Sequence, residues 1–298
     1  MIVTAENLHK KFGRTEALNG ASLAVPEGSA FALIGANGAG KTTTIKLLLN
    51  AIAPSKGRAT VLGVDSRKLS PHELAQIGYV SEGQQLPQGL SVGAYLDYLR
   101  PYYPAWDEAL EAALLAQFGL PRARRIGALS HGMRMKLAFA AALPYRPKLF
   151  ILDEPFGGID PLVRDELMAG LLQQAGETTI FISSHDLGEI EGMVSHVGYL
   201  ERGKLLFQES FDDLGARIRD VRVTLERAVT LPPNLPAAWL NVAAQGAVVS
   251  FVDTRYAPAE LGPRVTAVLG AFRQIDVEPL GLRQMFTALA RSAAQRGT

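Results

Sequence analysis

The chain has 298 residues, 48% of them hydrophobic, which is enough to bury the core of one large or two medium domains. Its 30 Lys and Arg residues nearly balance 29 Asp and Glu residues, which argues against the strongly basic surface of a nucleic-acid-binding protein. The lack of cysteine excludes a disulfide framework, a thiolate metal site and a cysteine nucleophile. Apolar runs fall well short of the ~20 residues that cross a bilayer, so we expect a chain that does not span a membrane by itself.

The first predicted elements surround a glycine-rich loop. The chain opens on IVTAENLHKKFG, which predicts a strand rather than a secretion signal. A second strand-like run, SAFALIG, leads into GANGAGKTTTIKLLLN, which continues as an apolar helix. Residues 35–42 fit the pattern G-x-x-x-x-G-K-[ST], and both flanking elements are those that the pattern requires. The sequence therefore predicts a site for a nucleoside triphosphate.

Each residue type in this loop has a chemical reason. Glycines at Gly35, Gly38 and Gly40 let backbone N–H groups converge on phosphates, where side chains would obstruct them. We expect Lys41 to reach the β- and γ-phosphates and Thr42 to ligate Mg²⁺ through its hydroxyl. The helix that starts here directs the positive end of its dipole at the nucleotide. The predicted nucleotide-binding loop also includes Ala36, Asn37, Ala39 and Thr43.

The stretch ALSHGMRMKLAFAAAL predicts a helix that begins after Ser130 and is closed by Pro144. Serine is a good N-cap, and Gly132 lets the backbone turn tightly. A helix start with an exposed hydroxyl and with Arg134 and Lys136 close behind is a potential anion site. Nothing nearby in the sequence supplies a phosphate cradle for it.

A pair of acids follows the next apolar strand. In PKLFILDEPFGGIDP, residues 149–152 predict a strand that delivers Asp153 and Glu154. Such acids are costly at the end of a buried strand unless cations or protons use them. Asp153 therefore fits a direct or indirect partner of Mg²⁺, and Glu154 fits the residue that polarises the attacking water. The alternative, two acids on a solvated loop, is disfavoured after a phosphate loop and an apolar strand.

Together these residues resemble the ABC-type ATPases, and the resemblance extends over about the first 215 residues. In that family the segment that matches LSHGM is the signature motif, which completes the ATP site of a second subunit in a head-to-tail dimer. The resemblance thus gives Ser130 and Gly132 a γ-phosphate held by another chain. The common family version has glycine in place of His131 and glutamine in place of Met133.

Four further residues take roles from the same resemblance. Phe12 occupies the position of the aromatic that stacks on adenine, and Asp160 lies in the loop GGIDP that crosses the dimer interface. His185, in TIFISSHDLGEIE, matches the switch histidine that senses the γ-phosphate. Glu82 stands where the family usually has a glutamine that contacts Mg²⁺ and responds to the transmembrane partner. The resemblance therefore implies the catalytic residues Glu154 and His185 and the metal-binding residues Thr42, Asp153 and Glu82.

The implied fold is α/β, a P-loop NTPase core of the ABC ATPase kind over residues 1–215 with a helical subdomain at about 83–146. Residues 216–298 predict a small α+β accessory domain, for which interaction or dimer support is favoured over a second active site. Its predicted elements are strands at 221–227, 246–253 and 273–279, a helix at 263–272 and a final helix from Leu282.

The implied function is ATP binding and hydrolysis that energises a membrane ABC transporter, an exporter, through ATP-driven head-to-tail dimerisation. ATP would be the substrate and Mg²⁺ the cofactor. The implied partners are a second copy or a homologous ATPase subunit and separate transmembrane permease subunits, with no direct nucleic acid. The implied location is cytoplasmic, peripheral on the inner face of the cell membrane.

Two alternatives bear on this interpretation. A soluble ABC ATPase acting on nucleic acid or ribosomes usually carries two ATPase cores or a very long coiled-coil insertion, and this chain has neither. RPYYPAWD, residues 100–107, resembles a pattern in bacterial exporter ATPases linked to antibiotic or peptide efflux. An aromatic cluster between prolines equally fits a structural corner.

Overall fold

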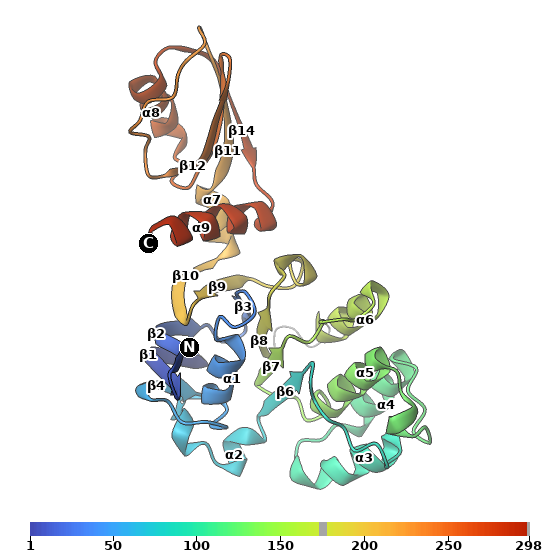
Figure 1. Ribbon diagram of the computed structural model, residues 1–298. Helices are drawn as coiled ribbons and strands as arrows, with labels where there is room; N and C mark the ends of the chain where they lie inside the picture. Colours follow the sequence, from blue (N-terminus) through green and yellow to red (C-terminus); the bar gives the residue numbers. More distant parts are fainter. Residues whose placement is uncertain (173–177, 297–298) are drawn as a thin grey trace. The chain divides into compact units, whose positions relative to one another are not determined.

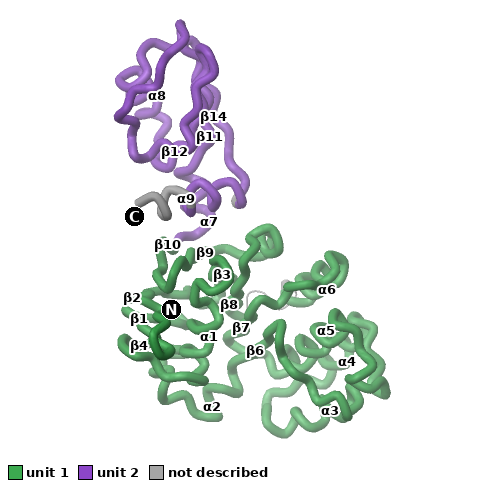
Figure 2. Tube along the Cα trace, viewed as in Figure 1, with its two compact units in different colours: residues 1–208 green, residues 209–298 purple. Residues whose placement is uncertain are grey.

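The structure, a computed structural model, describes residues 1–172 and 178–296. The chain forms two compact units, Met1–Gln208 and Glu209–Thr298, coloured green and purple in Figure 2. Within the described residues, no helix has both the length and the apolar character that crossing a membrane requires.

The boundary between the units lies earlier than the predicted one, after residue 208 instead of residue 215. Helix α7 (Phe211–Arg217) belongs to the second unit through its last residue. The Arg217 guanidinium pairs with Glu209 and donates a hydrogen bond of 2.7 Å to the carbonyl of Thr254. The bond to Thr254 spans 37 residues of sequence, so local patterns did not reveal it.

The centre of the first unit is a six-stranded sheet (Figure 1). Its strands, in order across the sheet, are β10 (Lys204–Ser210), β9 (His196–Glu201), β3 (Ala30–Ile34), β8 (Thr179–Ser184), β7 (Leu149–Asp153) and β6 (Ile77–Ser81). Strands β9 to β6 run parallel, and β7 and β8 are buried along their whole length, as expected for apolar strands covered on both faces. The register sets Asp153 beside both Ser81 and Ser183, so the carboxyl ends of three strands meet at one edge. Ligands bind at this edge in open α/β sheets.

A second sheet in the first unit shares a hydrophobic core with the central one. Its strands, in order, are β2 (Thr15–Val25), β1 (Val3–Phe12), β4 (Lys56–Val61) and β5 (Val64–Asp65), all antiparallel to their neighbours. Helix α1 (Lys41–Leu48) buries Ile45, Leu47 and Leu48 in the same core. The helix that follows the phosphate loop is therefore anchored against the two sheets by apolar side chains after its first turn.

The helical region of the first unit contains α3 (Val92–Leu99), α4 (Glu108–Gln117) and α5 (His131–Ala142), drawn in green shades in Figure 1. The Ser130 side chain caps α5 by accepting a hydrogen bond of 3.3 Å from the Met133 N–H, which confirms the predicted helix start. The short α2 (Pro71–Leu74) precedes this region, and α6 (Pro161–Leu172) follows β7.

A buried carboxylate connects α4 to the segments that precede and follow it. Glu111 of α4 is 2% exposed, and it accepts hydrogen bonds from Arg100 at 3.1 Å and from the Trp106 indole at 2.8 Å. Arg122, in the segment ahead of Ser130, completes its surroundings. Because RPYYPAWD supplies two of these partners, the segment has a structural role in this region.

The second unit has a four-stranded antiparallel sheet covered on one face by a helix. The strands, in order, are β12 (Trp239–Gln245), β13 (Val248–Asp253), β11 (Arg219–Leu225) and β14 (Phe272–Pro279). Helix α8 (Pro258–Leu269) packs Leu261 and Val265 on a core in which Trp239 and Phe251 stack at 4.0 Å. The last helix is α9 (Leu282–Arg296).

Two elements of this unit differ from the sequence prediction. Strand β12 was not predicted, because WLNVAAQ has no clear alternation of apolar and polar residues and its pairing with β13 shifts register after Leu240. Helix α8 begins at Pro258, whereas the sequence predicts a start at Pro263, since proline is common in a first helical turn. The structure tolerates Pro263 inside the helix.

Candidate nucleotide site

Residues 35–40 form the turn between β3 and α1. The geometry of this turn requires glycine at two positions, Gly35 and Gly40. Gly40 has φ +110°, and a Cβ there would lie 2.6 Å from the carbonyl of Ala17. A Cβ at Gly35 would lie 2.3 Å from the carbonyl of Leu200. Around Gly38, also at positive φ, the space is open. No side chain caps the start of α1, so its first N–H groups face the loop in the arrangement that binds anions.

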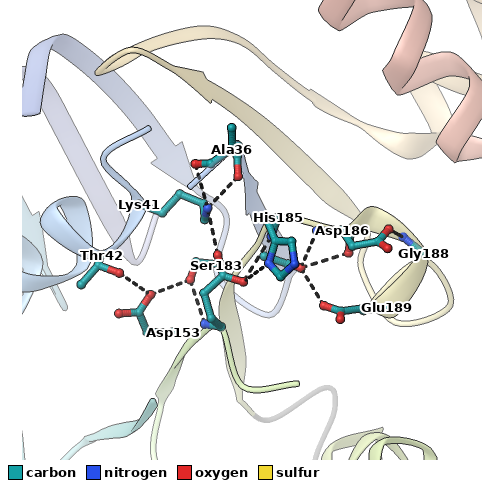
Figure 3. A network of polar contacts seen from close by, with 12 residues as sticks. Ala36, Lys41, Thr42, Asp153, Ser183, His185, Asp186, Gly188 and Glu189 are labelled. Carbon is teal, nitrogen blue, oxygen red and sulfur yellow. Dashed lines mark hydrogen bonds and ion pairs between the residues drawn. The ribbon is translucent and has the colours of Figure 1, made fainter. Parts of the chain in front are cut away.

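The Lys41 ammonium lies across this loop (Figure 3). Its Nζ donates hydrogen bonds of 2.6 Å to the Gly35 carbonyl and 3.2 Å to the Ala36 carbonyl, and lies 2.8 Å from Glu154 Oε1. The side chain is only 5% exposed. All three ammonium donors therefore have acceptors, and a phosphate oxygen would compete with the Glu154 carboxylate for one of them.

Asp153 receives two hydroxyl groups at the carboxyl end of β7. Thr42 Oγ1 and Ser183 Oγ donate to the same carboxylate oxygen, Oδ1, at 3.0 Å and 2.7 Å (Figure 3). Thr42, Asp153 and Glu82 line one cavity of about 300 Å³, so the structure brings the predicted metal-binding residues together. Among the described residues, no three His, Cys, Asp or Glu side chains form a metal cluster. The donors here fit Mg²⁺, which commonly takes one or two protein oxygens and completes its shell with phosphate and water.

Glu154 follows directly and has an unusual backbone. Its φ is +51°, a left-handed value that costs free energy in a residue with a side chain. Glu154 Oε2 accepts a hydrogen bond of 3.2 Å from the His185 N–H and lies 2.8 Å from His185 Nδ1. Burial opposes ionisation of this carboxyl, but hydrogen bonds from Lys41 and His185 outweigh it and lower the pKa of Glu154. An ionised carboxylate is thus held at the sheet edge.

Phe12 lies beside the phosphate loop. Its ring is 49% exposed, and it lines a cavity of about 320 Å³ together with Asn37, Gly38 and Thr43. The Lys10 ammonium lies 5.0 Å from the ring centroid, in the range of a cation–π contact. An aromatic face next to the loop is suited to stacking on a base. Ala39, in contrast, is buried in the core.

The segment LSHGM lies apart from these cavities. Ser130 and His131 are exposed, and none of the residues 130–133 lines the two cavities described above. His131 Nε2 is 3.4 Å from the Gly157 carbonyl, in the loop after β7. Asp160, at the end of that loop, is exposed, and its carboxylate accepts a hydrogen bond of 2.9 Å from the Leu162 N–H at the start of α6. The exposed hydroxyl of Ser130 therefore has no phosphate loop of its own chain beside it.

Comparison with known proteins decides the family. The sequence profile described as ABC transporter matches residues 18–157. The chain is 35% identical over 226 residues to the bacitracin transport ATP-binding protein BcrA of Bacillus licheniformis, which covers 73% of this chain and 72% of BcrA. The chain belongs to the ABC transporter ATP-binding proteins.

Two further comparisons place this ABC ATPase more fully. It is 31% identical over 295 residues to the daunorubicin resistance ATP-binding protein DrrA2 of Streptomyces coeruleorubidus, covering 95% of this chain and 91% of DrrA2. A solved structure of the ATP binding subunit of an ABC transporter matches with a TM-score of 0.66 at 27% identity, covering 72% of this chain and 92% of that one. The chain is thus an ATP-binding and ATP-hydrolysing subunit with the ABC ATPase fold. The similarity to DrrA2 is long enough to include the second unit.

Sequence reasoning missed one polar residue of this ABC ATPase site, Ser183. Its hydroxyl contacts both Asp153 and the backbone of Glu154, yet it stands in the apolar strand TIFISS, 30 residues away. The available signal was weak: a serine is unusual near the end of a largely apolar parallel strand, and Ser183 stands two residues before His185.

The pair formed by Glu154 and His185 gives a testable pH dependence. The pKa of His185 is raised, mainly by its hydrogen bond to the Glu154 carboxylate, and burial opposes this only in part. The pair therefore stabilises the fold fully below the unfolded histidine pKa of ~6.5, and this contribution is lost as pH rises through the higher folded pKa. In Glu154→Gln we expect the pKa of His185 to fall toward the ordinary value. NMR titration of the imidazole measures it, and an identical titration in both proteins would contradict the pairing.

Proposed function

We propose that this ATPase subunit energises a membrane exporter, and that it binds as an MgATP-loaded dimer to separate transmembrane permease subunits at the cytoplasmic face of the membrane. The observation that carries the proposal is the similarity to DrrA2 along 95% of the chain, which includes the second unit. The relatives named for bacitracin and lantibiotic transport support the same kind of role.

In the proposed cycle, Lys41 changes partner when ATP binds. The ammonium leaves Glu154 Oε1, 2.8 Å away, for the γ-phosphate, where the negative charge is denser. The Thr42 hydroxyl and the Asp153 carboxylate would hold Mg²⁺, which would supply positive charge to the phosphates. Glu82 lines the same cavity and would accept from a water of that shell. Phe12 would stack on the adenine.

The exchange at Lys41 frees one carboxylate oxygen of Glu154 for a water molecule. We assign Glu154 the role of general base, because its lowered pKa keeps it ionised. We assign His185 the role of orienting this carboxylate relative to the γ-phosphate. The attacking water gives its proton to Glu154 as its oxygen bonds to the γ-phosphorus, and the bond to ADP breaks.

The second half of each site would come from the partner subunit. Ser130 and the N–H groups at the start of α5 form an exposed anion-binding helix end without a phosphate loop of their own chain. In a head-to-tail dimer this end would meet the γ-phosphate held by the other subunit, with Gly132 allowing close approach and with His131, Met133 and Asp160 at the interface. A solved ABC transporter cassette of the same fold is described as dimeric.

Purification from native membranes tests the assignment to a transporter. We expect the tagged chain to be recovered from detergent-solubilised membranes with a transmembrane protein in fixed ratio, and to show a changed ATPase rate when that protein is present. Recovery with ribosomes, or loss of its partners on nuclease treatment, would favour the alternative of a soluble ABC ATPase acting on nucleic acid or ribosomes.

A further inference from the structure

The end of β8 holds a serine in contact with the two acids of the ATPase site. Ser183 is fully buried, with 0% of its surface exposed. Its hydroxyl donates a hydrogen bond of 2.7 Å to Asp153 Oδ1 and accepts one of 3.0 Å from the backbone N–H of Glu154. One side chain thus bonds to both residues through a donor and an acceptor at the same time.

The bond to Asp153 fixes how that carboxylate is turned. Thr42 Oγ1 donates to the same oxygen at 3.0 Å, so Oδ1 is held from the phosphate loop on one side and from β8 on the other. Two donors on one oxygen resist rotation of the carboxylate, and they set the direction of its second oxygen.

The bond to Glu154 supports a strained backbone. The left-handed φ of +51° persists only where the surroundings hold it, and the Glu154 N–H donates to the hydroxyl and, at 3.2 Å, to the carbonyl of Ser183. His185, two residues further along the chain, holds the carboxylate of the same glutamate. The end of β8 and the residue that follows it therefore hydrogen-bond to both the backbone and the side chain of Glu154.

We propose that Ser183 is a positioning residue for ATP hydrolysis, which keeps Asp153 and Glu154 in a fixed mutual orientation. The inference rests on the roles proposed above for these two acids. A hydroxyl suits the position because it donates to a carboxylate and accepts from an N–H at once, whereas an alanine or valine in this strand would do neither.

The test compares Ser183→Ala with Ser29→Ala in the full-length chain. Ser29 is also buried, and its hydroxyl donates 2.6 Å to the Pro26 carbonyl, with no contact to the site. We expect kcat for ATP hydrolysis to fall about 10- to 100-fold in Ser183→Ala, the factor for losing hydrogen bonds to a charged group. The melting temperature should stay near that of Ser29→Ala, and KM for ATP should change much less than kcat, because the phosphate loop is untouched.

Restoring the hydroxyl should restore the rate. We expect Ser183→Thr to recover most of kcat, and Ser183→Cys, with a weaker donor, to lie between alanine and serine. If the extra methyl of threonine overpacks the strand and lowers the melting temperature, the cysteine variant, which adds no methyl, still tests the rescue.

Two results would overturn the inference. One is a kcat of Ser183→Ala within about twofold of Ser29→Ala. The other is a parallel loss of kcat, ATP affinity and melting temperature without rescue by either variant, which would indicate a general structural role. Glu154→Gln in the same assay separates this from the proposed function: full hydrolysis by that variant would remove the base assignment itself.

Discussion

Lys41→Ala is expected to weaken MgATP binding by more than about 100-fold, the largest single effect that we predict on affinity. The side chain is 5% exposed and lies inside the loop, so its charge acts on phosphates with little screening by water. Alanine leaves the concentrated negative charge of the triphosphate without this cation. Isothermal titration calorimetry with MgATP measures the loss.

Lys56→Ala is the matched control for this variant. Lys56 is an exposed lysine of β4 that lines none of the cavities next to the phosphate loop, so its loss should leave the affinity for MgATP unchanged. Both variants should remain folded, since the phosphate loop is shaped by its glycines and α1 is anchored by apolar residues. Equal affinity of Lys41→Ala and Lys56→Ala would remove the phosphate-site assignment.

The local parts of the site could be predicted from the sequence because their spacing is dictated by chemistry. The phosphate loop needs glycines where a Cβ would strike a carbonyl, and the structure shows such contacts at Gly35 and Gly40. The helix after Ser130 carries its start signal at the N-cap. In each case the residues and the local backbone geometry that requires them lie within one short segment.

Features that depend on the register between distant segments could not be predicted. Ser183 reaches Asp153 only because β7 and β8 pair in parallel with those two residues side by side. The pair of Lys41 and Glu154 likewise joins residues that no local pattern connects. Strand β12 forms because β13 offers it a partner, although its own sequence favours no element.

The placement of LSHGM leads to the prediction with the largest effect on assembly. Glu154→Gln keeps the size of the side chain but removes the base, so hydrolysis should stop while ATP stays bound. ATP held between two subunits should then keep the dimer closed. Adding Ser130→Arg places bulk and charge at the exposed start of α5, where the opposing γ-phosphate must fit. With MgATP, light scattering should report a dimer for Glu154→Gln and a monomer for Glu154→Gln/Ser130→Arg.

The control for this pair is Glu154→Gln/Ser91→Arg, which should dimerise like Glu154→Gln. Ser91 caps α3 by accepting a hydrogen bond of 3.2 Å from the Ala94 N–H, so both arginine variants lose an N-cap, at a cost of about 1 kcal/mol in each. Only Ser130 is assigned a contact with the phosphate bound by the other subunit.

The monomeric variant should still bind ATP, because Phe12 and the phosphate loop belong to the same chain. Self-association through the second unit would be recognised by its independence of MgATP. Equal ATP-driven dimerisation of the two arginine variants, or loss of ATP binding in the Ser130→Arg variant alone, would contradict an ATP site shared between two subunits.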